Sequence, residues 1–223
     1  MSSLPRIDYY FDVVSPFAYI GFEALHQIEK QWSGVTVKYI PFFVAAVMKE
    51  SGNSTPASVP AKTRMFVADA IRMGKYWDVP IRTNPKFIEW LLTYNTRRAL
   101  RILLVLQAED EELMKKAARE MWLRLWYRRE KIFENADFEE ILKAVGVNNI
   151  QEVIDKSESP EIKNKLAENT KTAVDQGAFG TPWIAVHTTD GNTTNFFGGD
   201  RFHLIAELLN QPHPLPEKYL AKL

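Results

Sequence analysis

The sequence predicts an α/β fold in which a small sheet domain is interrupted by a long helical insertion. Strand patterns occur near both ends of the chain, in the order strand–helix–strand at the start and strand–strand–helix at the finish. Between residues 44 and 176 strand signals almost vanish and helical periodicity replaces them. We therefore expect residues 1–50 and 177–223 to form the sheet domain and residues 51–176 to form the insertion.

The first part of the chain has the pattern of a βαβ unit. Residues 7–14 are rich in aromatic and β-branched side chains, which favours a buried strand. Ser15 and Pro16 then give a helix start, with serine at the N-cap and proline at the first helical position. The helical pattern continues to Trp32, and residues 35–43 form a second strand pattern. The two strands are most simply parallel.

The middle of the chain is predicted to be helical after a polar loop over residues 51–62. Apolar residues at helical spacing predict its helices. They are expected over residues 61–76, from Pro85 behind an Asn84 cap, over 96–108, from Asp110, over 138–145, and over 160–176 behind a Ser159 cap. Methionine and tryptophan stripes on these helices are interpreted as packing rather than as a cofactor site.

The last part of the chain returns to strands. Residues 183–187 and 193–197 form a hairpin around the Asp190-Gly191 turn, and Asp200 can cap a final helix over residues 201–209. Thr181-Pro182 stands at the entrance of the first strand and is a candidate cis peptide. A cis bond would turn the backbone N–H and C=O of Thr181 outward, where an extended peptide-like ligand can pair with them. The alternative is that Thr-Pro only marks a loop.

Composition excludes several classes of function. The 223 residues carry 28 basic and 28 acidic side chains, so no polyanionic partner is implied. The basic cluster Arg124, Arg128, Arg129 and Lys131 is expected to be a solvated helix face rather than a nucleic-acid site. Cysteine is absent, which rules out disulfides and thiol chemistry by the chain itself. The four histidines form no metal-binding pair, so no metal site is expected, and no apolar run is long enough to span a membrane.

Four motifs in this order resemble the kappa-class glutathione transferases and the related 2-hydroxychromene-2-carboxylate isomerases. They are Asp12-Val-Val-Ser-Pro-Phe-Ala-Tyr-Ile-Gly-Phe-Glu23, Met48-Lys-Glu-Ser-Gly-Asn53, Gly177-Ala-Phe-Gly-Thr-Pro182 and Phe197-Gly-Gly-Asp-Arg201. The resemblance implies a thioredoxin-like fold, a homodimer, and glutathione as co-substrate with no other cofactor. It implies conjugation of glutathione to small hydrophobic electrophiles, with reduction of organic peroxides as a further activity. The alternatives are a glutathione-dependent isomerase and a non-catalytic glutathione-binding or chaperone-like protein.

The resemblance also assigns residues. Ser15 would face the glutathione sulfur, with Pro16, Phe17 and Pro182 beside it, and Thr181 would pair through its backbone with the cysteinyl part. Gly199, Asp200 and Arg201 would hold the γ-glutamyl end, and Asn53 and Lys62 the glycyl end. Phe17-Ala18-Tyr19 replaces the Tyr-Ser-Trp often seen in the family, and Thr181 replaces an aliphatic residue. These departures leave the electrophile preference open.

The expected chemistry at Ser15 follows from its place at a helix start. Free N–H groups and the positive end of the helix dipole favour an anion there. The hydroxyl can cap the helix as an acceptor and still donate its proton to sulfur. A purely structural capping role is the alternative.

The chain has no secretory signal pattern, so secretion is not expected. Ala221-Lys222-Leu223 is similar to the Ser-Lys-Leu peroxisomal address, which predicts a peroxisomal protein recognised by an import receptor. The mitochondrial matrix is the alternative. The proline-containing segment 212–216 is expected to carry this tail away from the folded body.

Overall fold

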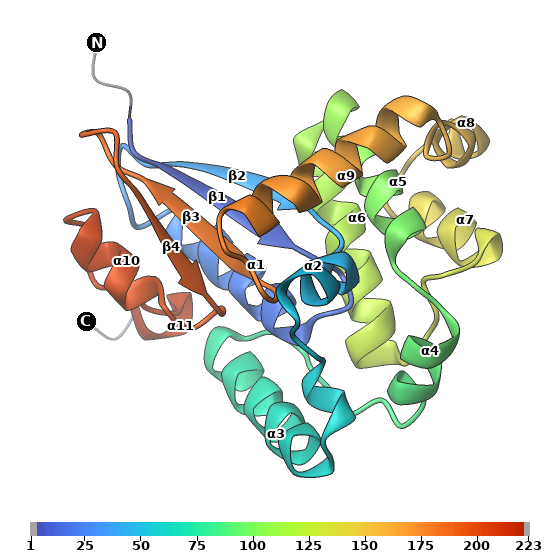
Figure 1. The fold of residues 1–223 in the computed structure, drawn as a ribbon, viewed down its shortest axis with the longest axis horizontal. Helices are drawn as coiled ribbons and strands as arrows, with labels where there is room; N and C mark the ends of the chain where they lie inside the picture. Colours follow the sequence, from blue (N-terminus) through green and yellow to red (C-terminus); the bar gives the residue numbers. More distant parts are fainter. Residues whose placement is uncertain (1–3, 221–223) are drawn as a thin grey trace.

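The computed structural model describes residues 4–220 and contains a four-stranded mixed sheet with the strand order β2-β1-β3-β4 (Figure 1). The strands are β1 (Arg6–Phe11), β2 (Thr36–Pro41), β3 (Trp183–His187) and β4 (Thr193–Phe197). β1 pairs with β2 in parallel, whereas β3 is antiparallel to both β1 and β4. The predicted βαβ unit and C-terminal hairpin are confirmed.

Helices cover both faces of the sheet. Successive side chains of β1 point to opposite faces, and each set enters a core that includes helices. Tyr9 and Phe11 enter the larger core, which also contains buried residues of α1 (Pro16–Ile28) and α10 (Phe202–Leu208). Tyr10 points the other way, into a smaller core shared with α2 (Val44–Ser51) and α9 (Pro160–Asp175). Figure 1 shows α2 and α9 in front of the sheet and α1 behind it.

The helical segment lies beside and below the sheet in Figure 1. Its helices are α3 (Pro60–Trp77), α4 (Phe87–Thr93), α5 (Arg97–Glu109), α6 (Glu111–Leu123), α7 (Asn135–Ala144) and α8 (Ile150–Lys156). A 3₁₀ turn (Pro56–Ser58) precedes α3, and a π-helical turn (Arg124–Arg128) follows α6. Trp122 of α6 is fully buried, and its ring centre lies 5.4 Å from that of Phe11 and 5.1 Å from that of Phe22. The helical segment is thereby packed onto β1 and α1.

Two predicted helix caps are confirmed, at Ser15 and Ser159, and Asp110, which was predicted only as a helix start, is a third cap. The side chains of Ser15, Asp110 and Ser159 each accept a hydrogen bond from a backbone N–H in the first turn of α1, α6 and α9, respectively. Such bonds satisfy donors that the first turn of a helix otherwise leaves unpaired.

Two predicted caps are wrong. Asn84 forms a local turn in which its Oδ1 accepts from the N–H of Lys86, and α4 begins only at Phe87. The N-cap of α10 is Arg201, without a side-chain capping bond, and the Asp200 carboxylate pairs with the Arg201 guanidinium instead. The helices α2 and α8 were not predicted.

Arg124 corrects the prediction of a solvated basic face. Its side chain is only 10% exposed, and its guanidinium lies 2.8 Å from the Glu140 carboxylate and 3.6 Å from that of Glu130. Arg128 and Lys131 also pair with carboxylates, whereas Arg129 donates to the carbonyl of Thr83. No helix within residues 4–220 is both long and apolar enough to cross a membrane.

The segment over residues 212–216 does not leave the folded body, contrary to the prediction. The Trp32 indole N–H donates to the carbonyl of Pro212 at 2.9 Å. The Gln31 amide donates to the carbonyl of Leu215 at 2.7 Å and accepts from the N–H of Leu215 at 3.2 Å. These bonds hold the segment against the end of α1, ahead of α11 (Glu217–Leu220). Ala221-Lys222-Leu223 lies outside the described residues.

Candidate functional site

Ser15 ends the turn that follows β1 and starts α1. Its Oγ accepts from the N–H of Ala18 at 3.2 Å, and its N–H donates to the carbonyl of Asp12 at 3.1 Å. The residue is 8% exposed. Because the capping bond uses the hydroxyl oxygen as an acceptor, the hydroxyl proton stays available for donation. In the described contacts the N–H of Phe17, in the same turn, also has no partner.

Thr181 lies next to this turn, and its peptide bond to Pro182 is cis. The N–H of Asp12 lies 3.3 Å from the Thr181 Oγ1, which accepts its hydrogen bond. Within residues 4–220, no hydrogen bond uses the backbone N–H or C=O of Thr181. An unpaired backbone edge therefore adjoins the Ser15 turn, which is the arrangement needed to pair with an extended ligand.

Gly199 brings the segment after β4 against the first turn of α1. A Cβ at this position would lie 2.8 Å from the carbonyl oxygen of Phe17 and 3.1 Å from the Cα of Gly21. Only glycine allows this approach without a shift of the main chain. Asp200 and Arg201, which pair with each other, therefore follow directly after a contact with the Ser15 helix.

Asn53 and Lys62 come from the start of the helical segment. The Asn53 amide donates to the carbonyl of Phe179 at 2.7 Å, which ties it to the loop before Thr181. Lys62 is exposed on the first turn of α3. Four residues later on that helix, Phe66 places its ring centre 5.1 Å from that of Phe17. Since i and i+4 share a helix face, Lys62 lies on the side of α3 that faces α1.

The structure thus brings most of the predicted residues to the N-terminal end of α1. Contacts connect Ser15, Phe17, Asn53, Thr181 and Gly199 to this turn or to the loop beside it. No recorded contact in the described part of the chain joins Lys62 to the others. Their roles toward a ligand stay predictions.

Asp12 also lies at this turn, and it was not predicted as a site residue. Its side chain is fully buried and accepts three hydrogen bonds, from the N–H of Val14, the N–H of Val44 and the hydroxyl of Thr96. Burial raises the pKa of this carboxyl to about 6, against the lowering effect of these bonds. A signal was present in the sequence: Asp12 directly follows an apolar strand pattern, and a buried acidic residue needs bonding partners.

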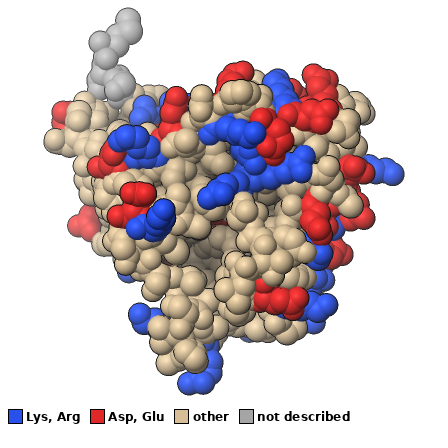
Figure 2. All heavy atoms as spheres, turned by 45° about the vertical axis from the view of Figure 1, so that its right-hand side comes forward, with Lys and Arg blue, Asp and Glu red and all other residues tan. Residues whose placement is uncertain are grey.

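Figure 2 shows a hollow in the middle of one face of the molecule, above α3, with Lys and Arg side chains gathered over it. A small hollow of about 120 Å³ borders Gly199 and Asp200, and Trp77, Phe202, His203 and His213 also line it. Within residues 4–220, no cluster of three or more His, Asp or Glu side chains is placed to hold a metal ion.

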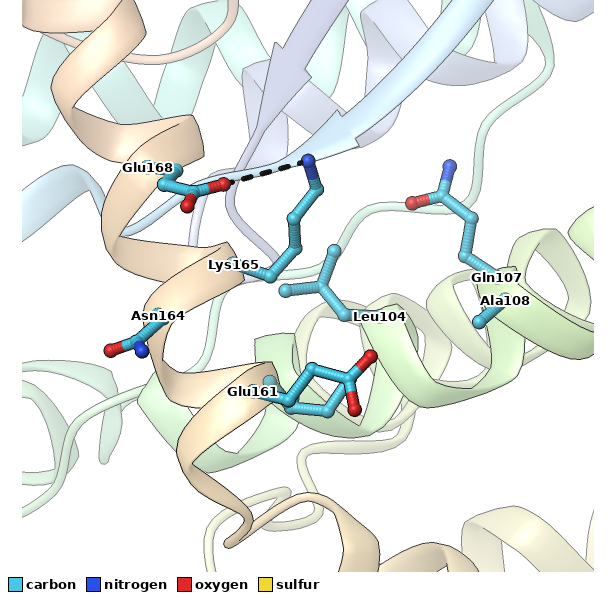
Figure 3. A pocket seen from close by; sticks show the side chains of 8 residues that line it. Leu104, Gln107, Ala108, Glu161, Asn164, Lys165 and Glu168 are labelled. Carbon is cyan, nitrogen blue, oxygen red and sulfur yellow. Dashed lines mark ion pairs between the residues drawn. The ribbon is translucent and has the colours of Figure 1, made fainter.

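A larger hollow of about 520 Å³ lies elsewhere, between α5 and α9 (Figure 3). Lys165 and Glu168 form an ion pair of 3.9 Å at its edge. Leu104, one of its lining residues, is eight residues beyond Thr96 on α5, or about 12 Å along the helix axis. The smaller hollow borders the predicted residues Gly199 and Asp200, whereas none of the predicted residues lines the larger one. The volume of a hollow alone therefore does not identify the site.

The fold and the site define a thioredoxin-type domain without cysteine. The model of the family described as DSBA-like thioredoxin domain matches residues 6–210. A solved structure of 2-hydroxychromene-2-carboxylate isomerase has a similar fold, with a TM-score of 0.72 at 17% identity over 92% of this chain and 94% of that one.

Similar sequences identify the family within this fold class. The chain is 56% identical to glutathione S-transferase kappa 1 of Caenorhabditis elegans, over 98% of this chain and 96% of that protein. It is 32% identical to glutathione S-transferase kappa 1 of Homo sapiens over the full length of both. The chain belongs to the kappa-class glutathione S-transferases.

Proposed function

We propose that the protein binds glutathione, stabilises its thiolate through Ser15 and conjugates it to small electrophiles. The observation that carries this proposal is the uncommitted hydroxyl proton of Ser15 at the start of α1, beside the open backbone of Thr181. A cysteinyl residue fits these two features. The Ser15 hydroxyl can stabilise its thiolate, and the Thr181 backbone can pair with its peptide groups.

Glutathione reacts as a thiolate, and a free thiol with a pKa of about 8.5 is less than about one tenth ionised at neutral pH. The N-terminus of α1 favours the anion through its free N–H of Phe17 and through the helix dipole. A hydrogen bond from Ser15 to the charged sulfur contributes about 1.5–3 kcal/mol, which corresponds to about one to two pKa units. Together these effects make the thiolate the main species near pH 7.

The remaining residues suit the two ends of the tripeptide. Asp200 would meet the γ-glutamyl ammonium and Arg201 its carboxylate, since these two side chains already form a pair of opposite charges. Gly199 places them beside α1. Asn53 and Lys62 would hold the glycyl carboxylate, while Pro16 and Pro182 flank the sulfur.

The electrophile would lie against Phe17 and Phe66, whose rings are in edge-to-face contact. Aromatic side chains of this kind bind flat apolar molecules by burial and by ring packing. The hollow in Figure 2 is above α3, the helix that carries Phe66. We expect reduction of organic peroxides as a second activity of the same thiolate.

A glutathione-dependent isomerase is the second candidate, and the fold similarity to 2-hydroxychromene-2-carboxylate isomerase favours it. In that reaction the thiol adds to an unsaturated substrate and leaves again. Product analysis separates the two, since a transferase leaves a stable conjugate and an isomerase returns glutathione unconsumed. Glutathione binding without turnover of any aryl halide or peroxide would instead indicate a binding or chaperone-like protein.

The test of the proposal is Ser15→Ala, with Ser159→Ala as its control. Both variants lose a serine N-cap, at a cost of about 1 kcal/mol of stability, but Ser159 caps α9 away from the site. In Ser15→Ala the pKa of the bound thiol should rise by about one to two units, and conjugation at pH 7 should fall about ten- to a hundredfold. Ultraviolet titration of the thiolate measures the first effect. An unchanged thiol pKa would show that Ser15 is only a cap.

The protein would work as a homodimer, as the family resemblance implies, and sedimentation at working concentrations would measure this. Ala221-Lys222-Leu223 would direct it to peroxisomes through an import receptor, with the mitochondrial matrix as the alternative.

A further inference from the structure

We propose that Asp12 is a positioning residue for glutathione binding, which holds the start of α5 in the helical segment against the Ser15 turn and Thr181. This inference rests on the proposed function. Asp12 follows the last residue of β1, so it belongs to the sheet, whereas Thr96 and α5 belong to the helical segment. Their contact joins residues that are 84 positions apart in the sequence.

Asp12 forms hydrogen bonds with four segments of the chain: the Ser15 turn, the Thr181 loop and the starts of α2 and α5. The Asp12 carbonyl accepts from the N–H of Ser15, and its N–H donates to Thr181. Its carboxylate accepts from Val44 at 3.1 Å and from Thr96 at 3.0 Å. The two residues proposed to contact the cysteinyl part of glutathione are therefore both bonded to the residue that anchors α2 and α5.

Asp12 supports both helix starts, because neither N-cap residue bonds its own first turn through its side chain; in α5 the Asn95 Oδ1 accepts from the N–H of Arg97 at 3.1 Å. Val44 is the first residue of α2, whose N-cap, Phe43, makes no side-chain bond. Thr96 is the N-cap of α5, and its hydroxyl bonds Asp12 instead of its own first turn. The carboxylate thus accepts from the first turn of one helix and from the N-cap of the other. Removing it would leave a buried donor at each.

Ionisation of the buried Asp12 carboxyl lowers the stability of the fold at neutral pH. This loss favours a functional role for Asp12 over a purely structural one. Its pKa is raised from its ordinary value to about 6 by burial. For an acid whose folded-state pKa is raised, the stability contribution is full below the unfolded pKa and is lost as the pH rises through the folded pKa. Ionised Asp12 therefore opposes folding at pH 7. Groups kept at such a cost concentrate at functional sites.

No charged side chain is among the hydrogen-bond partners of Asp12 in the described part of the chain. Arg97 follows Thr96 on α5, but its guanidinium lies over the ring of Phe43, 4.6 Å from the ring centre. His203 and His213, whose imidazole side chains are ionisable, line the hollow beside Gly199. A test by pH must separate Asp12 from these histidines.

Binding of S-hexylglutathione is the measurement, because this ligand has no ionisable thiol that would titrate along with Asp12, and the Asp12→Asn variant separates Asp12 from the histidines. At pH 7, Thr96→Val should weaken the affinity about tenfold, the loss of one hydrogen bond to a charged group. Thr96→Ser, which keeps the hydroxyl, should restore most of it. Thr170→Val is the matched control, because this buried threonine of α9 bonds Phe43 and Leu166 but not Asp12.

The pH profile distinguishes positioning from simple destabilisation. Wild-type affinity should fall as Asp12 is protonated near pH 6, and the fall should begin at higher pH in Thr96→Val, since the Thr96 bond lowers the pKa of Asp12. In Asp12→Asn the fall attributable to Asp12 should be absent and affinity should be low throughout. Equal affinity and an unchanged profile in a folded Thr96→Val would overturn the inference. If the wild type itself fails to bind, it is the proposed function that fails.

Discussion

Gly199 shows how a single missing side chain shapes the glutathione site. Its Cα lies where any Cβ would be 2.8 Å from the carbonyl oxygen of Phe17, and a backbone atom in a helix cannot move aside cheaply. Gly199→Ala should therefore displace the segment that carries Asp200 and Arg201. We expect glutathione affinity to fall about tenfold, because even a misplacement of about 1 Å can cost up to about a hundredfold where positioning matters.

Ser15→Ala is the control for Gly199→Ala, because the two variants should change different quantities. In Gly199→Ala the hydroxyl of Ser15 is untouched, so the pKa of the bound thiol should stay as in the wild type while the dissociation constant rises. Calorimetric titration with glutathione and ultraviolet titration of the thiolate measure the two quantities separately. A shifted thiol pKa with normal affinity would show that Gly199 acts on the sulfur rather than on the γ-glutamyl end.

Single residues were predictable from sequence where a local rule applied. Ser15 stands before a proline at a helix start, and that pattern alone predicts the cap that the structure contains. Asp12 could not be placed in the same way, because its partners Val44 and Thr96 are 32 and 84 residues away. Asp200 was misassigned as a cap because its sequence position suits one, while the neighbouring Arg201 offers its carboxylate a stronger partner.

Trp122 is the main contact through which α6 packs onto the sheet domain. Its fully buried ring is stacked 5.2 Å from that of Tyr19 and also contacts Phe11 and Phe22. Trp122→Ala should lower the free energy of unfolding by about 3–5 kcal/mol, the usual cost of a large cavity in a packed core.

Trp122→Phe is the matched variant. It keeps most of the ring packing and removes an indole N–H that has no hydrogen-bond partner among the described residues. An unpaired buried donor costs about 1–3 kcal/mol, so its removal should offset much of the lost packing. Urea unfolding of the two variants measures the difference. A loss of stability in Trp122→Phe, relative to the wild type, that exceeds what the removed ring atoms explain would mean that the N–H is bonded, by water for example, in the folded protein.

Elements were predictable to the extent that their patterns are local. Residues 183–187 and 193–197 were predicted as strands and are β3 and β4, because alternation and an Asp-Gly turn specify a hairpin. The helix α2 was missed, because it directly follows the β2 pattern and begins without a capping side chain of its own. Its first N–H is satisfied by Asp12 from another element, which no local pattern records.

At the scale of the whole molecule, the N-terminal and C-terminal parts of the chain meet at the C-terminal end of α1. The C-terminal segment returns to this helix, where Gln27 accepts from the N–H of Glu217 at 3.0 Å and Gln31 bonds Leu215. Lys218 adds an ion pair of 2.9 Å with Asp78 at the end of α3. Proline content alone predicted a departing tail, and it failed because the side chains that hold this segment lie about 180 residues earlier in the chain.

The C-terminal contacts make the proposed peroxisomal address testable without disturbing the fold. The anchors Gln27, Gln31 and Trp32 bond residues 212–217, so removal of Ala221-Lys222-Leu223 leaves them intact. We expect the shortened protein to keep the unfolding midpoint and the conjugation rate of the wild type. A version tagged at its N-terminus should move from peroxisomes to the surrounding cytosol, because the receptor reads the last three residues. Conversion of Leu223 to Lys is a subtler variant that keeps the length and should give the same result. If neither change alters the distribution, the three residues are not the address, and a mitochondrial location becomes the better proposal.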